Sequence, residues 1–240
     1  MSETLVLLHG FGGTRRTWDR VIAQLDPQRY RPQALDLPGH GESSSLERPI
    51  TFERSVEEVL RVAPERFVLC GYSMGGRIAL HAALAAPERV QRLVLVSSTA
   101  GIEDAAERRD RRLADGQLAE RLESRPFEEF IESWRMQPLF ADELPQVSAL
   151  ARDDHRRNRP EALAASLRGV GTGEMAPLWD RLGELTMPVQ FVVGERDAKF
   201  RALASRMREL VPQAELDVVP GGHGVPLESP LALAQVLQRP

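Results

Sequence analysis

The fold is decided by residues 67–86, which read FVLCGYSMGGRIALHAALAA. The run from Phe67 to Cys70 is apolar throughout, as expected of a strand buried on both faces of a parallel sheet. A Gly-x-Ser-x-Gly turn follows, and the alanine-rich residues 77–86 favour a helix that Pro87 ends. A serine between a strand and a helix is typical of a strained turn, in which a Cβ on either flanking glycine would collide with neighbouring backbone. The segment therefore predicts that Ser73 is a reactive serine at the N-terminus of a helix.

The alternation of strand and helix continues on both sides of this segment. Short apolar runs predict strands, and amphipathic runs between them predict helices. The predicted strands are 5–8, 33–37, 67–70, 90–96, 189–193 and 216–219, and the predicted helices are 18–25, 52–62, 77–86, 202–211 and 231–237. This order predicts an α/β fold with a mostly parallel sheet and helices on both faces.

Residues 101–171 have a different texture, because they contain no strand-like run. Their arginine-rich, amphipathic segments predict helices at 105–123, 127–134, 145–157 and 160–168. We interpret 101–171 as a helical cap inserted into a core made of residues 1–100 and 172–240. Open parallel sheets bind ligands at the C-terminal ends of their strands, so the cap is expected to lie over that edge.

Composition narrows the class of protein. The chain has 240 residues, 42% of them hydrophobic and 28% charged, as in a folded globular protein of one or two domains. A net charge of −4 disfavours nucleic acid or a membrane surface as a partner. The lone cysteine, Cys70, allows no intramolecular disulfide and fits a cytoplasmic location. The apolar run near the N-terminus is too short for a signal peptide, and a monomer is the default expectation.

A reactive serine needs a base, and that base needs an orienting carboxylate. Of the five histidines, His223 lies in a glycine-rich turn after the last predicted strand, which fits the chain order serine, acid, histidine. Asp197 follows the strand 189–193, with Glu195 as the neighbour that could be mistaken for it. The predicted triad is therefore Ser73, Asp197 and His223.

Two backbone N–H groups are candidates for an oxyanion hole. One belongs to Met74, which follows the serine, and the other to Phe11, in the glycine-rich loop HGFGG (9–13) that ends the first strand. The glycines allow this loop to approach the serine closely.

These motifs resemble the α/β-hydrolase superfamily over nearly the whole chain. The resemblance is closer to one branch, the 2-succinyl-6-hydroxy-2,4-cyclohexadiene-1-carboxylate synthases of menaquinone biosynthesis. The stretches that carry it are GGR (75–77), WRMQPLF (134–140), AASLRGVGTG (164–173), LW (178–179) and GERDAKF (194–200). The cap stretches discriminate, because general hydrolases share the serine turn but not these.

The resemblance implies a lyase that needs no cofactor or metal. It would eliminate pyruvate from 2-succinyl-5-enolpyruvyl-6-hydroxy-3-cyclohexene-1-carboxylate, a ring compound with three carboxylates. The triad would assist removal of a proton and would not form an acyl-enzyme. The oxyanion hole would stabilise the enolate-like charge that develops.

The resemblance also implies cationic residues that bind the polycarboxylate substrate. Arg77 matches the family's motif, although a surface arginine is the alternative. Arg111 matches by its spacing from Gly101, with Arg108 and Arg112 as neighbours that could be confused with it. A third arginine is expected near Asn158. This chain has His155 at the best-spaced position, so Arg156 is the candidate and a solvated helix face is the alternative.

Two aromatic residues complete the predicted substrate site. Trp134 matches the family's cap tryptophan and would lie over the substrate ring, while a core aromatic is the alternative. Tyr72 precedes the serine and would shape the pocket, with simple packing as the alternative.

Two other functions remain open at this level. The same triad would serve a hydrolase of an ester, a thioester or a carbon–carbon bond. A ligand receptor that retains a triad without turnover is the third possibility, but the sequence offers no recognisable partner surface for it.

Overall fold

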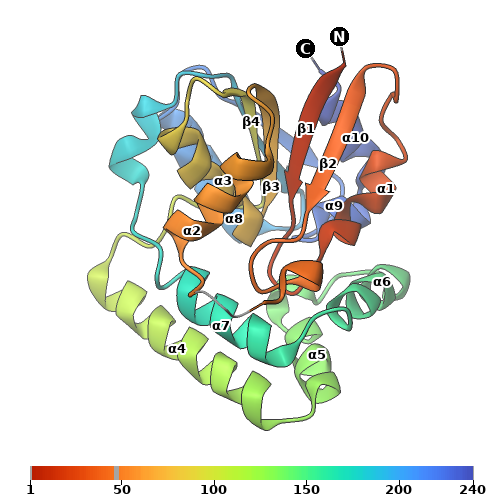
Figure 1. The fold of residues 1–240 in the computed structure, drawn as a ribbon, viewed down its shortest axis with the longest axis vertical. Coiled ribbons are helices and arrows are strands. Elements are labelled where there is room, and N and C mark those ends of the chain that lie inside the picture. Colours follow the sequence, from red (N-terminus) through yellow and green to blue (C-terminus); the bar gives the residue numbers. More distant parts are fainter. Residues whose placement is uncertain (1, 46–48, 240) are drawn as a thin grey trace.

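The computed structural model describes residues 2–45 and 49–239. Within these residues, six strands form one parallel sheet in the order β2-β1-β3-β4-β5-β6. They are β1 (Glu3–Leu8), β2 (Tyr30–Leu35), β3 (Phe67–Tyr72), β4 (Val90–Val96), β5 (Val189–Gly194) and β6 (Glu215–Val219). The C-terminal ends of the strands reach one common edge, at the lower side of the sheet in Figure 1. The predicted α/β fold with a parallel sheet is confirmed.

Helices cover both faces of the sheet, and the pleat of each strand divides its side chains between them. In β1, Val6 and Leu8 pack into one hydrophobic core, while Leu5 and Leu7 pack into another on the opposite face. The helices of the first face are α2 (Phe52–Val62), α3 (Met74–Ala85) and α8 (Ala198–Glu209), and those of the second are α1 (Asp19–Ile22) and α10 (Pro230–Leu237). Burial on both faces explains why the central strands are apolar throughout.

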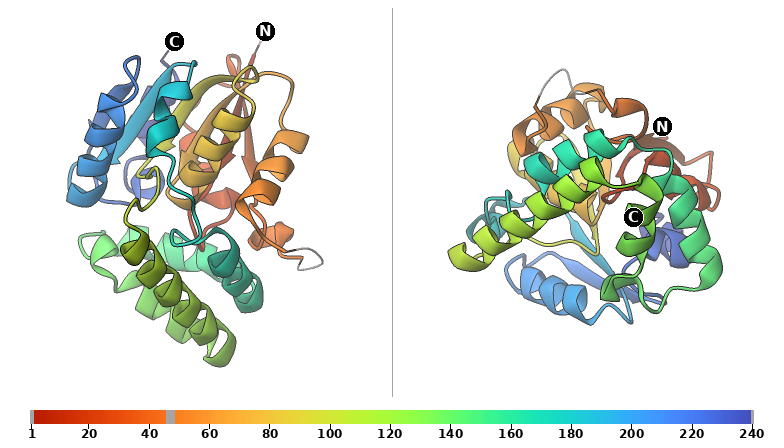
Figure 2. Two further views of the ribbon diagram at one scale, coloured as in Figure 1. Left: turned by 90° about the vertical axis from the view of Figure 1, so that its left-hand side faces the viewer. Right: turned by 90° about the horizontal axis from the view of Figure 1, so that it is seen from below.

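The segment between β4 and β5 forms helices that lie across the C-terminal edge of the sheet (Figures 1 and 2). They are α4 (Ala105–Ser124), α5 (Phe127–Arg135), α6 (Pro145–His155) and α7 (Pro160–Val170), and we call them the cap. The cap has a small hydrophobic core of its own, which includes Leu122, Phe130 and Leu163. No helix in the described part of the chain is long and apolar enough to cross a bilayer.

The turn at Ser73 has the strain that the sequence predicts. Ser73 adopts φ 51° and ψ −109°, a conformation that residues with a side chain rarely adopt. A Cβ on Gly71 would lie 2.3 Å from the carbonyl oxygen of Gly75, and a Cβ on Gly75 would lie 2.4 Å from that of Leu8. Both glycines are therefore needed, because the turn packs directly against itself and against the end of β1.

Some boundaries differ from the sequence prediction for local reasons. The predicted strand 33–37 is shifted to Tyr30–Leu35, because β2 pairs with β1 in the register Glu3 to Tyr30. Helix α8 begins before 202, because the Asp197 side chain accepts a hydrogen bond from the Phe200 amide and caps the helix. The predicted helix 18–25 divides into a 3₁₀ turn and α1. Short elements that the sequence did not reveal are α9 (Val225–Glu228) and the 3₁₀ helices η1 (Arg15–Trp18), η2 (Gly41–Ser43), η3 (Pro138–Phe140) and η4 (Trp179–Glu184).

Two glycine-to-alanine substitutions should have opposite effects on stability. Gly75→Ala should lower the free energy of unfolding by about 1–3 kcal/mol or more, because its Cβ would press on backbone that cannot move away. Gly116→Ala should raise it by about 0.5–1 kcal/mol, because no atom lies within 4 Å of a Cβ at this position in α4. Urea unfolding of both variants measures the difference, and equal stabilities would contradict the packing of the serine turn.

Candidate active site

The structure brings Ser73, His223 and Asp197 together at the C-terminal edge of the sheet. The distance from His223 Nε2 to Ser73 Oγ is 3.1 Å, and that from His223 Nδ1 to Asp197 Oδ2 is 2.7 Å. Asp197 follows β5 and His223 follows β6, so neighbouring strands deliver the carboxylate and the imidazole to the serine. Both are buried, at 6% and 2% exposure respectively. This geometry allows His223 to accept a proton from Ser73 while Asp197 holds the ring.

Asp197, and not the nearby Glu195, is the acid that contacts His223. Asp197 also accepts the amide hydrogen bond that starts α8, which fixes its side chain. Glu195 is exposed, and its carboxylate lies 3.7 Å from the Arg196 guanidinium, on the surface. Glu195, the alternative acid in the sequence, therefore makes no contact with His223 in the structure.

Glu228 holds the turn that carries His223, a role that the sequence did not predict. Its carboxylate accepts the amide hydrogens of Gly222 and Gly224, at 2.9 and 3.1 Å, and so brackets the turn that carries His223. Arg196 donates to the same carboxylate at 2.6 Å. The short helix α9, which places Glu228 here, gives too weak a pattern to predict, although an acid five residues after a candidate base is a usable signal.

Aromatic rings enclose His223. The ring centroids of Phe200, Tyr72 and Phe140 lie 4.5, 5.5 and 6.0 Å from that of the imidazole. Phe140 comes from the cap, so the wall around the base is shared between cap and core. Burial raises the pKa of the Tyr72 hydroxyl, which therefore stays protonated at neutral pH.

The loop over residues 10–14, which we call the oxyanion loop, is held by buried histidines. The Leu37 amide donates to His9 Nε2 at 3.0 Å, so the ring proton of neutral His9 is on Nδ1, 2.8 Å from the Gly10 carbonyl oxygen. The Gly12 amide donates to His40 Nε2 at 3.2 Å. Burial lowers the pKa of both histidines and keeps them neutral. Neither faces Ser73 as a base, and both shape the loop.

The candidate oxyanion donors are free to receive a ligand. Among the hydrogen bonds of the described residues, none uses the N–H of Phe11 or Met74. Met74 opens α3, where the first amides of a helix have no partner within it. In the trans Gly10–Phe11 peptide, the Phe11 N–H points opposite to the Gly10 carbonyl, which His9 holds.

A cavity of about 1070 Å³ lies between cap and core, with Ser73 and His223 in its wall. Its lining includes Phe11, Met74, Tyr72, Arg77, Arg111 and Trp134 from the predicted site. The structure thus gathers these residues, from both core and cap, around one space.

Arg77 is a buried cation without a carboxylate partner among the described residues. It is 7% exposed, and its Nη1 donates to the Val170 carbonyl oxygen at 2.6 Å. Burial and, after it, the positive charge of Arg111 lower the pKa of this guanidinium to about 9, although the negative charge of Asp115 opposes them. An anion bound in the cavity would offset both effects.

Arg111 is the member of the group Arg108, Arg111 and Arg112 that lines the cavity. Its Nε donates to Asp115 Oδ1 at 2.8 Å, and Asp115 is buried. Arg112 instead pairs with Glu174 at 2.7 Å and does not line the cavity. Arg108 is used by backbone carbonyls near the start of α4. The spacing from Gly101 therefore singled out the one of these neighbours that the cavity contacts.

Trp134 lies at the cavity and also packs within the cap. Its ring contacts Phe11 edge-on at 4.9 Å and stacks with Phe130 at 6.0 Å. Trp134 therefore lines the cavity and is also part of the aromatic packing of the cap. The contact with Phe11 ties the cap tryptophan to the oxyanion loop.

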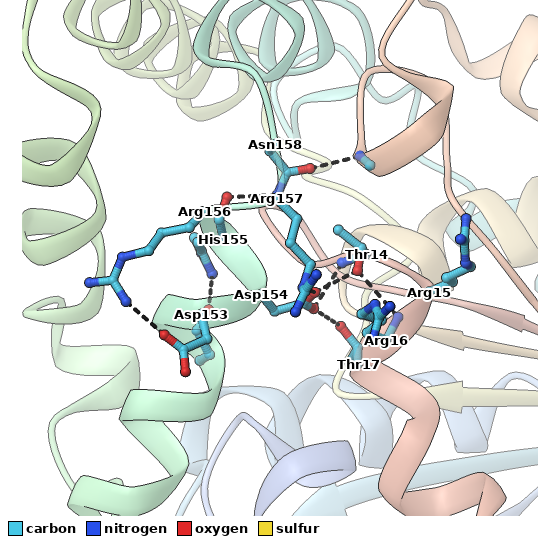
Figure 3. Close-up of polar contacts among 12 residues, drawn as sticks. Thr14, Arg15, Arg16, Thr17, Asp153, Asp154, His155, Arg156, Arg157 and Asn158 are labelled. Atoms are coloured by element: carbon cyan, nitrogen blue, oxygen red, sulfur yellow. Dashed lines mark hydrogen bonds and ion pairs between the residues drawn. The ribbon is translucent and has the colours of Figure 1, made fainter.

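The prediction for Arg156 needs correction, because this residue lies outside the cavity. Its guanidinium pairs with Glu128 and, at 2.7 Å, with Asp153 on the exposed face of the cap (Figure 3). One residue along a helix turns the side chain by about 100°, so His155 points inward where Arg156 points outward. His155 is 4% exposed, and burial lowers its pKa to about 4, so no cation stands at this position at neutral pH.

Other cations line the cavity and were not assigned to it from the sequence. They are Arg196, Lys199 and Arg206, which lie before and along α8. Arg206 pairs with Glu103, and its guanidinium lies 4.0 Å above the Trp179 ring. The run GERDAKF (194–200) carries a signal for Arg196 and Lys199, since both are close in sequence to the predicted acid at the end of β5, whereas Arg206 lies outside this run.

Comparison with known proteins agrees with this geometry. The sequence profile of the Alpha/beta hydrolase family matches residues 5–236. The putative 2-succinyl-6-hydroxy-2,4-cyclohexadiene-1-carboxylate synthase of Bacillus subtilis is 33% identical, over 98% of this chain and 89% of the relative. The corresponding synthase of Salmonella agona is 34% identical, over 99% and 94%. MenH from S. aureus superposes with a TM-score of 0.93 at 33% identity, over 98% of this chain and 91% of that one. The chain therefore belongs to the Alpha/beta hydrolase family and, within it, to the family of 2-succinyl-6-hydroxy-2,4-cyclohexadiene-1-carboxylate synthases.

Proposed function

We propose that this protein eliminates pyruvate from 2-succinyl-5-enolpyruvyl-6-hydroxy-3-cyclohexene-1-carboxylate to give 2-succinyl-6-hydroxy-2,4-cyclohexadiene-1-carboxylate, a step of menaquinone biosynthesis. Its relatives carry the name of this synthase and align with it over almost their full length. The observation that carries the proposal is Arg77, a buried guanidinium that forms no ion pair with a described carboxylate and lines the same cavity as the Ser73–His223 pair. Such a cation calls for an anionic ligand.

The proposed mechanism uses the triad as a base. Ser73 Oγ removes the proton from the ring carbon that bears the succinyl group, and passes its own proton to His223. The electrons of the C–H bond form a ring double bond, the existing double bond shifts by one position, and the bond from the ring to the enolpyruvyl oxygen breaks. Enolpyruvate leaves and takes up a proton to become pyruvate.

The oxyanion hole supports the same proton removal. Proton loss next to the succinyl carbonyl places negative charge on its oxygen. We assign the N–H groups of Phe11 and Met74 to that oxygen, because neither has a hydrogen-bond partner within residues 2–45 and 49–239 and both residues line the cavity. Fixed backbone donors of this kind lower a barrier by roughly 3–4 kcal/mol each.

Charge recognition falls to arginines, which bind carboxylates bidentately at about 1.5–3 kcal/mol for each charged hydrogen bond. We assign Arg77 and Arg111 to substrate carboxylates, Trp134 to the substrate ring and Tyr72 to the pocket wall. Asp115 offsets part of the charge of Arg111 and holds it in place. We also propose a monomer in the cytoplasm, which suits a small-molecule substrate and a single buried thiol.

Substitution of the triad should stop the elimination. Ser73→Ala and His223→Ala should each lower kcat by about 10³-fold or more, since the residues act as a unit. Pyruvate release and the absorbance of the cyclohexadiene, followed together, measure the effect. Rates near that of the unsubstituted protein for either variant would refute the proposed base.

The same assay separates the lyase from a serine hydrolase, the other chemistry that this triad geometry supports. A hydrolase would give no pyruvate from the cyclohexene substrate. It would instead show a rapid burst with an activated ester as the acyl-serine accumulates.

Loss of Arg77 should weaken transition-state binding. Arg77→Ala should lower kcat/KM by about 30- to 1000-fold, which corresponds to the roughly 2–4 kcal/mol lost when one partner of a buried charge pair is removed. Arg112→Ala is the matched control, because this arginine pairs with Glu174 away from the cavity. Steady-state kinetics decide the matter, and equal values for the two variants would remove Arg77 from the substrate site.

A further inference from the structure

The C-terminal end of α6 in the cap contacts the oxyanion loop through Asp154 and Thr14 (Figure 3). Asp154 is 8% exposed, and its Oδ2 accepts the Thr14 amide and the Thr17 hydroxyl, both at 2.9 Å. Its Oδ1 accepts the Thr14 hydroxyl. Asn158 is 6% exposed, and its Nδ2 donates to the Gly12 carbonyl oxygen at 2.7 Å. Buried polar groups so fully paired are rigid parts of a structure.

Core and cap divide the peptide groups of the oxyanion loop between them. The core histidines hold the first part, since His9 contacts the Gly10 carbonyl and His40 accepts the Gly12 amide. The cap holds the second part, since Asn158 binds the Gly12 carbonyl and Asp154 binds the Thr14 amide. The conformation of the loop therefore depends on where the cap helix lies.

We propose that Asn158 and Asp154 are positioning residues for the oxyanion hole, and that the cap in this way sets the direction of the Phe11 N–H. This inference rests on the proposed function. Neither residue lines the cavity, so both act through the loop.

The link to Phe11 runs through consecutive peptide planes. Asn158 fixes the Gly12–Gly13 plane by its carbonyl, and the N–H of the same plane donates to the Gly10 carbonyl oxygen at 3.1 Å. The Gly10–Phe11 plane carries the Phe11 N–H at its other end. A rotation of the first plane therefore loosens the second, and with it the oxyanion donor.

Steric contact adds to the hydrogen bonds. Gly12 adopts φ +76°, and a Cβ there would lie 2.5 Å from His155 Nε2. The imidazole of His155 thus packs closely against Gly12 from the cap side and leaves no room for a side chain there. The amide of Asn158 also accepts the Gly41 N–H at 2.9 Å, which joins the loop to the turn after β2.

Buried side chains recur at helical spacing along α6 and in the turn that follows it. Residues 147, 151, 154, 155 and 158 are buried, whereas 153, 156 and 157 are exposed. Asp153 and Asp154 therefore form a matched pair of adjacent carboxylates, of which only Asp154 contacts the oxyanion loop.

The test compares Asp154→Asn with Asp153→Asn, and adds Asn158→Asp. The last variant keeps the shape of the side chain and its contact with Gly41, but it replaces the donor to Gly12 by a carboxylate oxygen. Two rates are measured for each protein. One is pyruvate release, as kcat and KM, and the other is phosphonylation of Ser73 by a fluorophosphonate. In the second reaction an Oγ–P bond forms, fluoride leaves and the serine proton goes to His223.

Asp154→Asn and Asn158→Asp should lower kcat and the phosphonylation rate about 10- to 100-fold, with KM changed less than about threefold, since an oxyanion donor acts mainly in the transition state. Asp153→Asn should match the unsubstituted protein. A merely structural role would lower thermal stability without this split between kcat and KM. Should Asp154→Asn fail to fold, Asn158→Asp decides alone.

Each outcome bears on one proposal. Equal phosphonylation rates in Asn158→Asp and Asp153→Asn would overturn the positioning role, whatever the lyase assay gives. If the unsubstituted protein phosphonylates but releases no pyruvate, the proposed function fails. Slower phosphonylation in Asn158→Asp would then still support the positioning role.

Discussion

The site depends on one steric constraint, the close packing of the serine turn against the end of β1. Gly75 lies so near the Leu8 carbonyl that no side chain fits there, and in the same turn Ser73 adopts a positive φ. That conformation lifts the hydroxyl above the sheet edge and leaves the first amides of α3 unpaired. It also brings the oxyanion loop, which continues from β1, alongside the serine. Ser73, the N-terminus of α3 and the oxyanion loop thus lie together where these backbone segments meet.

Charge is the second organising element of the cavity. Several surface arginines of the cap form ion pairs with acids nearby, as Arg156 does with Glu128 and Arg168 with Glu123. Such exposed pairs contribute little to stability, about 0–1 kcal/mol each. Arg77 differs, since it is buried and, among the described residues, forms no ion pair with a carboxylate; its contacts are the Val170 carbonyl oxygen and the face of the Phe52 ring. A cation in that state costs stability in the empty protein, and an anionic ligand bound beside it would recover that cost.

The cap is more than a cover over the substrate. It contributes Phe140 to the wall around His223, and Asp154 and Asn158 to the oxyanion loop. The sequence missed these contacts because each joins residues more than 80 positions apart. The buried side chains at the end of α6 and in the turn after it, Asp154, His155 and Asn158, do not look like a buried face in the sequence, because they are polar and their partners lie on the loop after β1. The same spacing explains why Arg156 faces solvent.

Taken alone, the sequence determined the parallel sheet, the helical nature of the insertion and the strained turn at Ser73. It also singled out Asp197 and His223 as the residues that lie beside Ser73. These features follow from local rules: apolar strands, obligatory glycines and the fixed edge at which parallel strands end. Only the tertiary structure decided which arginines face the cavity, how Glu228 supports the His223 turn, and that cap residues hold the oxyanion loop. Those depend on the rotation of each helix about its axis and on the placement of cap over core. Both are set by packing and buried hydrogen bonds between distant segments, which leave no periodic pattern in the chain.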